Sequence, residues 1–169
     1  ANVTVITAKD IEERGVVSVV EALGGDAGIN TRSVLGNPAT AQVSMRGFGE
    51  GSHGRVLVLV DGQRLNSPDM QGIDWLQVPL STVDRIEVVK GGNSSLYGDF
   101  ALAGVVNIFT KKGKNQPLAE VSVQGGSFGT YDTRIGGSWS EGASYMSLGG
   151  ESYRADGYRE RTAFRSDSI

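Results

Sequence analysis

Cysteine is absent from the sequence, and histidine occurs once, at His53. These two features exclude a disulfide scaffold, thiolate metal sites, a cysteine nucleophile and any zinc motif that needs two histidines. Long apolar runs are also missing: the longest run of Val, Leu and Ile, residues 56–60, falls far short of the roughly 20 residues that a membrane-spanning helix needs. We therefore expect no membrane helix, no metal site and no resident cofactor.

An excess of positive charge is lacking as well. The chain carries 16 Lys and Arg against 19 Asp and Glu, a net charge of -3. Nucleic-acid-binding domains usually carry a basic patch, so duplex binding is not expected. Glycine, in contrast, is abundant, with 25 of 169 residues, about twice its usual frequency. Because aromatic and β-branched residues persist beside it, this bias indicates turns and strands more than disorder.

Residues 1–112 carry the signals of an α+β domain. Capping patterns at Thr7 and Ser18 predict two short helices, one over residues 8–14 and a second that ends at Gly24. The pair Asp61-Gly62 predicts a tight hairpin turn. Strands are expected at about 42–46, 56–60, 85–89 and 105–109. Together these elements predict a four-stranded mixed sheet with short helices.

A polar, proline-closed segment at residues 113–118 reads as a linker, and alternation with a period of two dominates residues 119–169. Val121 and Val123 share one phase, and Asp132 and Arg134 lie on the polar phase of the next expected strand. Periodicity alone leaves two alternatives open, a soluble antiparallel sheet with one wet face or strands of an outer-membrane barrel. The pattern by itself favours the soluble sheet, because the barrel signal is weak in each strand.

Two catalytic motifs match in letters but fail in context, and a third is incomplete. Residues 49–54 fit the dinucleotide pattern G-x-G-x-x-G, which needs a helix directly after it, whereas a strand is expected at 56–60. Residues 125–129 fit G-x-S-x-G, but the nucleophile elbow needs a later histidine and His53 comes earlier. Residues 91–94 lack the lysine of a phosphate-binding loop. We therefore expect no enzyme.

A set of segments, read in order, resembles one family. In their order and spacing these segments are similar to the plug domain of TonB-dependent outer-membrane receptors, and the resemblance extends from residue 3 to about residue 112. Residues 119–169 then resemble the first strands of that family's barrel, which favours barrel strands over a soluble sheet. The segments are VITAKDI (5–11), MRGF (45–48), VLVDGQRL (58–65), PLSTVDRIEVVKGG (79–92), SLYG (95–98) and AGVVNI (103–108).

The resemblance implies an α+β plug domain at 1–112, a linker at 113–118 and, at 119–169, antiparallel strands of an incomplete transmembrane β-barrel. It also implies a receptor in the Gram-negative outer membrane that takes up a siderophore-iron or cobalamin-like ligand. TonB would then engage a segment upstream of residue 1. The family usually has Arg and Pro where this chain has Lys90 and Gly92. The alternative is a soluble plug-like interaction module without transport.

The resemblance also implies a polar latch between plug and barrel, made by Arg46, Arg85 and Glu87. Without the motif match, the two arginines are read as solvated strand charges. Within this chain alone, we expect them to be unpaired or satisfied only by local acids such as Asp84 and Glu87.

Loops beside the central strands carry aromatic, amide and charged side chains that suit an amphipathic ligand. The other interpretations are core packing for Trp75 and a solvated loop position for His53. The candidate ligand-binding residues are Phe48, Glu50, His53, Asn66, Asp69, Met70, Gln71 and Trp75.

Overall fold

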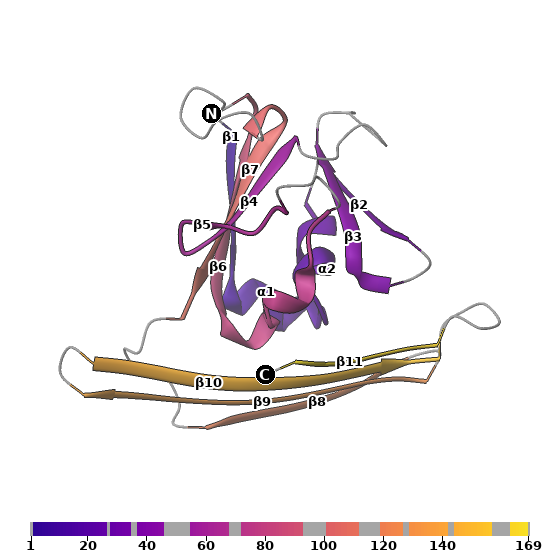
Figure 1. Cartoon of the computed structure of the whole chain (residues 1–169), viewed down its shortest axis with the longest axis vertical. Helices are drawn as coiled ribbons and strands as arrows, with labels where there is room; N and C mark the ends of the chain where they lie inside the picture. Colours follow the sequence, from indigo (N-terminus) through magenta and orange to yellow (C-terminus); the bar gives the residue numbers. More distant parts are fainter. Residues whose placement is uncertain are drawn as a thin grey trace.

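The computed structural model describes residues 2–26, 28–34, 37–45, 55–67, 72–92, 101–111, 119–126, 129–141, 144–156 and 163–168. These residues form two layers (Figure 1). An N-terminal body, comprising the described residues from 2 to 111, contains helices and two small sheets. A C-terminal sheet, comprising strands β8 to β11, lies across one end of that body.

No helix in the described part of the chain combines the length and the apolar character needed to cross a membrane.

A five-stranded mixed sheet forms the centre of the N-terminal body. Its order is β1-β6-β7-β4-β5, in which β4 runs parallel to β7 and the other neighbours are antiparallel. The mixed sheet with short helices is confirmed, but it has five strands where four were expected. The strands are β1 (Asn2–Thr7), β6 (Val83–Lys90), β7 (Gly104–Thr110), β4 (Val56–Val60) and β5 (Gln63–Arg64).

The expected strand at 42–46 belongs to a different sheet. It lies in β3 (Asn37–Met45), which pairs with β2 (Ile29–Val34) as a separate antiparallel hairpin. Pairing with the adjacent segment closes a short loop, which costs less entropy than reaching a distant strand. The edges of the central sheet are taken instead by β1 and β5. A two-residue period predicts a strand, but it does not identify the partner.

The two expected capped helices are confirmed, and they connect β1 to the β2–β3 hairpin. Helix α1 (Ala8–Arg14) begins after a capping box between Thr7 and Asp10, and the two Thr7 hydrogen bonds lower the pKa of the Asp10 carboxyl. Helix α2 (Val19–Gly24) has Ser18 as its N-cap. Helix α1 packs against β1 and β6 of the central sheet, whereas α2 packs mainly against β2 and β3.

The predicted hairpin between β4 and β5 is confirmed. Asp61 and Gly62 both have positive φ, 48° and 85°, as a type I′ turn requires. Strand β4 is buried on both faces: Val58 packs in the main core, while Leu57 lies in a smaller core on the opposite face. Gly104 starts β7 where a Cβ would lie 2.6 Å from Met45 Sδ, so glycine permits the close approach of β3.

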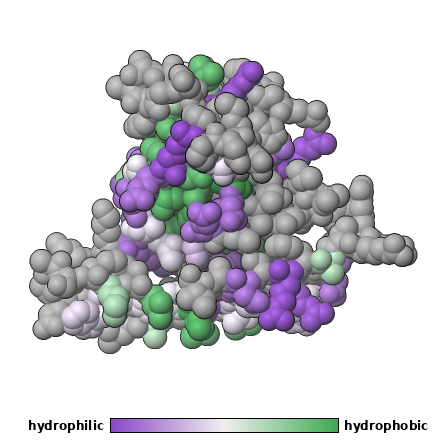
Figure 2. All heavy atoms as spheres, in the orientation of Figure 1, coloured by the Kyte–Doolittle hydropathy of each residue, from purple (hydrophilic) through white to green (hydrophobic). Residues whose placement is uncertain are grey.

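The C-terminal sheet is an antiparallel meander in the order β11-β10-β9-β8. Its strands are β8 (Glu120–Gly126), β9 (Thr130–Glu141), β10 (Ser144–Ala155) and β11 (Phe164–Ser168). In Figure 2 hydrophobic atoms gather along the side of this sheet that faces away from the N-terminal body. The expected alternation is confirmed, because one phase is exposed and apolar: Val121, Val123, Tyr131, Ile135, Trp139, Met146 and Leu148.

Candidate functional site

Backbone hydrogen bonds bring the ends of two segments together at one end of the central sheet. The Gly91 N–H donates to the Ala103 carbonyl at 3.1 Å, and the Ala103 N–H donates to the Arg55 carbonyl at 2.8 Å. Val56, the first residue of β4, lies opposite Gly104 in the parallel ladder. The chain therefore enters or leaves residues 46–54 and 93–100 at this place, which we call the loop end of the sheet.

A third segment begins and finishes near the loop end. The Ser67 N–H donates to the Gly72 carbonyl at 3.4 Å, which closes the ends of residues 68–71. Asn66, just before this segment, contacts the backbone of Val56. The N-terminus is on the same side, because Asn2 pairs with Lys90, and Figure 1 shows it remote from the C-terminal sheet. Residues 46–54 and 68–71 are thus anchored at the end of the body far from that sheet, whereas the segment of Trp75 contacts strand β11.

Most of the predicted ligand-binding residues lie outside the residues that the structure describes. The same is true of Arg46 in the predicted latch and of the predicted linker at 113–118. The ligand-binding residues concerned are Phe48, Glu50, His53, Asp69, Met70 and Gln71.

The amide side chain of Asn66 is buried and extends the sheet beyond β5. Its Oδ1 accepts from the Val58 N–H at 2.7 Å, and its Nδ2 donates to the Val56 carbonyl at 2.9 Å. Strand β5 pairs with β4 only at Leu59 and Val60. The Asn66 side chain therefore takes the place of a strand along the next part of β4.

Trp75 joins the central body to the β2–β3 hairpin. It begins the short 3-10 helix η2 (Trp75–Gln77), and its side chain is only 5% exposed. The indole Nε1–H donates to the Ala41 carbonyl of β3 at 2.7 Å. These contacts agree with the core-packing interpretation of Trp75, and its part in ligand binding stays a prediction.

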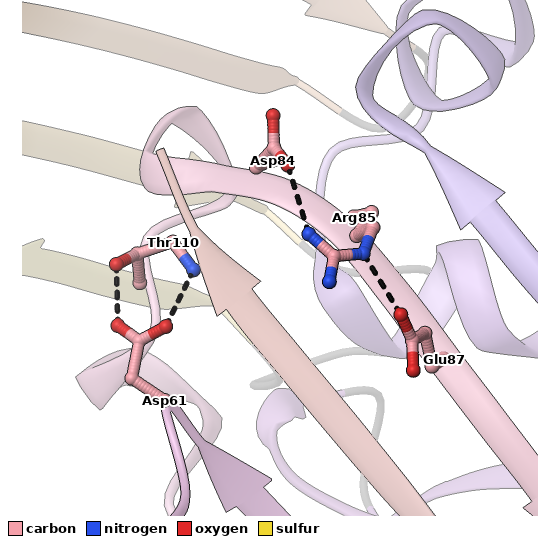
Figure 3. A network of polar contacts seen from close by, with 5 residues as sticks. All are labelled: Asp61, Asp84, Arg85, Glu87 and Thr110. Atoms are coloured by element: carbon pink, nitrogen blue, oxygen red, sulfur yellow. Dashed lines mark hydrogen bonds and ion pairs between the residues drawn. The ribbon is translucent and has the colours of Figure 1, made fainter. Parts of the chain in front are cut away.

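Arg85 forms a polar network with neighbouring acids on β6 (Figure 3). Its Nε donates to Glu87 at 2.8 Å, its Nη1 lies 3.4 Å from Asp84, and the guanidinium stacks 3.9 Å from the centre of the Phe109 ring. The Glu87 hydrogen bond raises the pKa of Arg85, so the side chain stays cationic. The expectation that local acids satisfy Arg85 within this chain is confirmed.

A second part of the network in Figure 3 ties the β4–β5 turn to the end of β7. The Asp61 carboxylate accepts from the Thr110 N–H at 3.1 Å and from its hydroxyl at 2.5 Å, while the Asp61 N–H donates to the Ile108 carbonyl. Arg85 pairs with Thr7 across the ladder to β1. Both parts of the network therefore lie at the end of the central sheet opposite the loop end.

The polar face of the C-terminal sheet contains a buried group of charges that the sequence did not assign to a site. Asp132 and Arg134 of β9 form an ion pair, and Glu151 of β10 lies beside them. The guanidinium also donates to the Val17 carbonyl of the N-terminal body at 2.6 Å. The period-two pattern placed Asp132 and Arg134 on one polar phase, but it gave no sign of what that phase faces.

The charged side chains of the described residues are not grouped as a metal centre. No group of three or more His, Asp or Glu residues suited to an ion occurs among them. A partly buried ion pair, Lys90 to Asp26 at 3.2 Å, joins the end of β6 to the turn after α2. Lys90, a departure from the usual family residue, therefore does form a cationic contact here.

Comparisons with known proteins agree with this architecture. The family described as "TonB-dependent Receptor Plug Domain" matches residues 1–105. The chain is 35% identical to the vitamin B12 transporter BtuB of Vibrio cholerae serotype O1, over 99% of this chain and 29% of that protein. It is 39% identical to the iron-regulated outer membrane virulence protein of the same organism, over 69% of this chain and 18% of that protein.

Solved structures give the same result. The siderophore receptor PirA of Acinetobacter baumannii matches with a TM-score of 0.67 and 29% identity, over 90% of this chain and 24% of that chain. The chain spans less than a third of the length of the curated relatives that it matches.

The chain belongs to the TonB-dependent receptor plug-domain family. Its N-terminal body has the plug fold, and its C-terminal sheet corresponds to part of the surrounding barrel. Members of this family are receptors of the Gram-negative outer membrane, in which the plug lies inside the barrel. The family expectation for residues 119–169 is therefore correct, and the soluble sheet that periodicity alone favoured is not.

Proposed function

We propose that this chain is the gate of a receptor that takes up a scarce iron chelate or cobalamin from outside the cell. The plug occupies residues 1–112, a linker 113–118 and the first barrel strands 119–169. TonB engages a segment upstream of residue 1 and supplies the energy for moving the plug. The observation that supports this proposal best is the contact between the N-terminal body and the polar face of the C-terminal sheet, whose other face is exposed and apolar.

The soluble interaction module is not supported. A soluble sheet would leave the apolar stripe of β8, β9 and β10 in water, whereas barrel strands expose such a stripe to lipid. The relatives and neighbours named above include a vitamin B12 transporter and a siderophore receptor.

For the ligand, we propose contacts from the segments anchored at the loop end. The side chains concerned are Phe48, Glu50, His53, Asp69, Met70 and Gln71, while Asn66 and Trp75 act indirectly by holding the sheet and hairpin that carry them. Their burial and backbone partners support this indirect role. The alignment over 99% of the chain is with a vitamin B12 transporter, so cobalamin is the first ligand to test.

The uptake proposal is tested with the full-length receptor in a Gram-negative host that lacks its own receptors for cobalamin and catecholate siderophores. Labelled cobalamin and a labelled ferric catecholate are supplied separately, in strains with and without TonB. We expect accumulation of one of the two ligands that disappears without TonB. Accumulation of neither ligand, or accumulation independent of TonB, would contradict the proposed transport.

The latch proposal concerns Arg85 and Glu87 at the end near the C-terminal sheet, together with Arg46. Arg85→Ala in the full-length receptor should change plug stability little, because its local ion pairs are partly exposed. Uptake should fall more than ligand binding, since the guanidinium is then missing from the contact with the barrel. Lys9→Ala, which removes a fully exposed pair with Glu13, is the matched control and should leave both unchanged. Wild-type uptake by Arg85→Ala would count against the latch.

A further inference from the structure

The buried charges of the C-terminal sheet lie on one small area of its polar face. Asp132 and Arg134 are two residues apart on β9 and so share a face, and Glu151 lies directly opposite Arg134 on β10. Their side chains are 1%, 8% and 17% exposed, although the other face of the same sheet is exposed. The N-terminal body covers them, and we refer to Asp132, Arg134 and Glu151 together as the clamp.

The clamp contacts the turn between α1 and α2. Arg134 Nη2 donates to the Val17 carbonyl at 2.6 Å, while the Val17 N–H donates to Glu21 Oε2 at 2.9 Å. Glu21 belongs to the first turn of α2, whose N-cap is Ser18. Both backbone polar groups of Val17 are therefore occupied, one by its own helix and the other by the opposite sheet. Figure 1 shows that this helical side of the body is the one that faces the C-terminal sheet.

Not every hydrogen-bonding atom of the clamp has a partner while the α1–α2 turn contacts it. Arg134 Nε lies 3.8 Å from Glu151 Oε1, too far for a hydrogen bond. Among the described residues, Arg134 Nε and Asp132 Oδ1 are buried without a hydrogen-bond partner. Seating the turn also brings the Glu21 charge close enough to act on Asp132. The carboxylates of Asp132 and Glu151 thus share one guanidinium, and Arg134 Nε and Asp132 Oδ1 can each form a further hydrogen bond.

This unused capacity means that the clamp has a second arrangement available. If the turn withdraws, Arg134 loses the Val17 carbonyl and Asp132 loses its like-charged neighbour Glu21. A movement of about 1 Å then brings Arg134 Nε to hydrogen-bond distance from Glu151. A charge-assisted hydrogen bond within the clamp replaces the one that the turn had accepted. The guanidinium is never left without a partner inside the barrel, which lowers the cost of releasing the plug.

We infer that Arg134 is a positioning residue with two alternative sets of partners: it holds the α1–α2 turn while the plug is seated, and it closes on Glu151 when the plug is released. This inference rests on the proposed function only in that the plug moves. It differs from the Arg85 latch because the arginine belongs to the barrel and its acceptor is a backbone carbonyl of the plug.

The test is hydrogen exchange in the full-length receptor without ligand and without TonB, so its outcome is independent of any transport assay. The reporters are the amides of residues 17–22, and the reference amides are those of the β6–β7 ladder. Arg134→Ala removes the donor and should speed exchange of the reporters on the order of tenfold or more. Arg134→Lys keeps the charge but not the forked donor, so it should give a smaller increase and serves if the alanine variant does not assemble.

Glu151→Gln should have the opposite effect. The substitution lowers the stability of the seated state little, because the contact of Glu151 with Arg134 is longer than a hydrogen bond there. It does weaken the charge-assisted hydrogen bond that Glu151 forms with Arg134 in the released state. Reporter exchange should therefore slow by a factor of about two to five. Arg154→Ala, which removes an exposed arginine of β10, is the matched control and should leave the reporters unchanged.

Two results would overturn the inference. Unchanged reporter exchange in both Arg134 variants would mean that the bond to Val17 does not hold the turn. Faster exchange in Glu151→Gln would mean that Glu151 only supports the seated state, so that no second arrangement exists.

Discussion

Trp75→Ala is expected to lower the stability of the plug by about 3 to 5 kcal/mol, the usual cost of deleting a buried indole. The loss should be concentrated at the β2–β3 hairpin. Trp75 supplies both a buried apolar surface and the donor to Ala41, and the hairpin has no ladder to the five-stranded sheet. Hydrogen exchange of β3 amides in the full-length receptor measures the effect.

Two further variants separate the contribution of the buried apolar surface from that of the hydrogen bond to Ala41. Trp75→Phe keeps much of the apolar surface but leaves the Ala41 carbonyl without its donor, so about 1 to 3 kcal/mol should be lost. Trp139→Phe alters an exposed tryptophan of the C-terminal sheet and should leave β3 exchange unchanged. If Trp75→Ala weakened ligand binding while β3 exchange stayed at the wild-type rate, Trp75 would be a direct ligand contact and its structural role would be wrong.

The elements that the sequence predicted well are those set by local interactions. The capping box at Thr7 satisfies orphan amides within a few residues, and the Asp61-Gly62 pair provides the positive φ values of its own turn. Neither depends on the rest of the fold. The same holds for the alternation of the C-terminal strands, since each residue's phase follows from its neighbours.

Strand partners, in contrast, could not be derived from the pattern. Val43 and Met45 alternate as any half-buried strand does, yet their strand pairs with β2 and not with a strand of the central sheet. In the sequence, strand β1 is marked only by a short β-branched run. Its partner β6 comes much later in the chain, near the end of the N-terminal body. Partner choice depends on packing that is distributed over the whole fold, and a single sequence does not display it.

The candidate site divides in the same way. The local pairs of Arg85 with Asp84 and Glu87 followed from their proximity in the chain. The contact of Arg134 with Val17 joins residues 117 positions apart, and no sequence motif predicts it. Asn66 is the most instructive position, because its polar side chain suggested a surface role while the structure uses it inside the sheet.

Asn66→Ala is expected to cost about 2 to 6 kcal/mol, because the Val58 N–H and the Val56 carbonyl both lose their partner and each orphaned group costs about 1 to 3 kcal/mol. The damage should appear first in the amides at the start of β4, next to the loop end. Asn30→Ala, at an exposed position of β2, is the control and should change stability by no more than about 0.5 kcal/mol.

Asn66→Asp is the sharper test, because it preserves the shape of the side chain and replaces only the amide NH2 group with an oxygen. The new carboxylate can still accept from the Val58 N–H, but it places an oxygen with no proton against the Val56 carbonyl. At neutral pH the loss should therefore exceed that of Asn66→Ala, since a buried charge is added to the missing donor. Burial raises the folded-state pKa of this carboxyl above the value of about 3.9 in the unfolded chain.

The folded state then binds the proton more tightly than the unfolded state, so the stability of Asn66→Asp falls as pH rises between these two pKa values. Below about pH 4 the carboxyl is protonated in both states and its hydroxyl donates to Val56, so the deficit relative to wild type should shrink. Asn30→Asp, at its exposed position, should show no such dependence. Hydrogen exchange of the Val58 amide between pH 4 and pH 7, corrected for intrinsic rates, measures this pH dependence of stability. A wild-type rate in Asn66→Asp at pH 7 would mean that this side chain is solvated and free to meet a ligand.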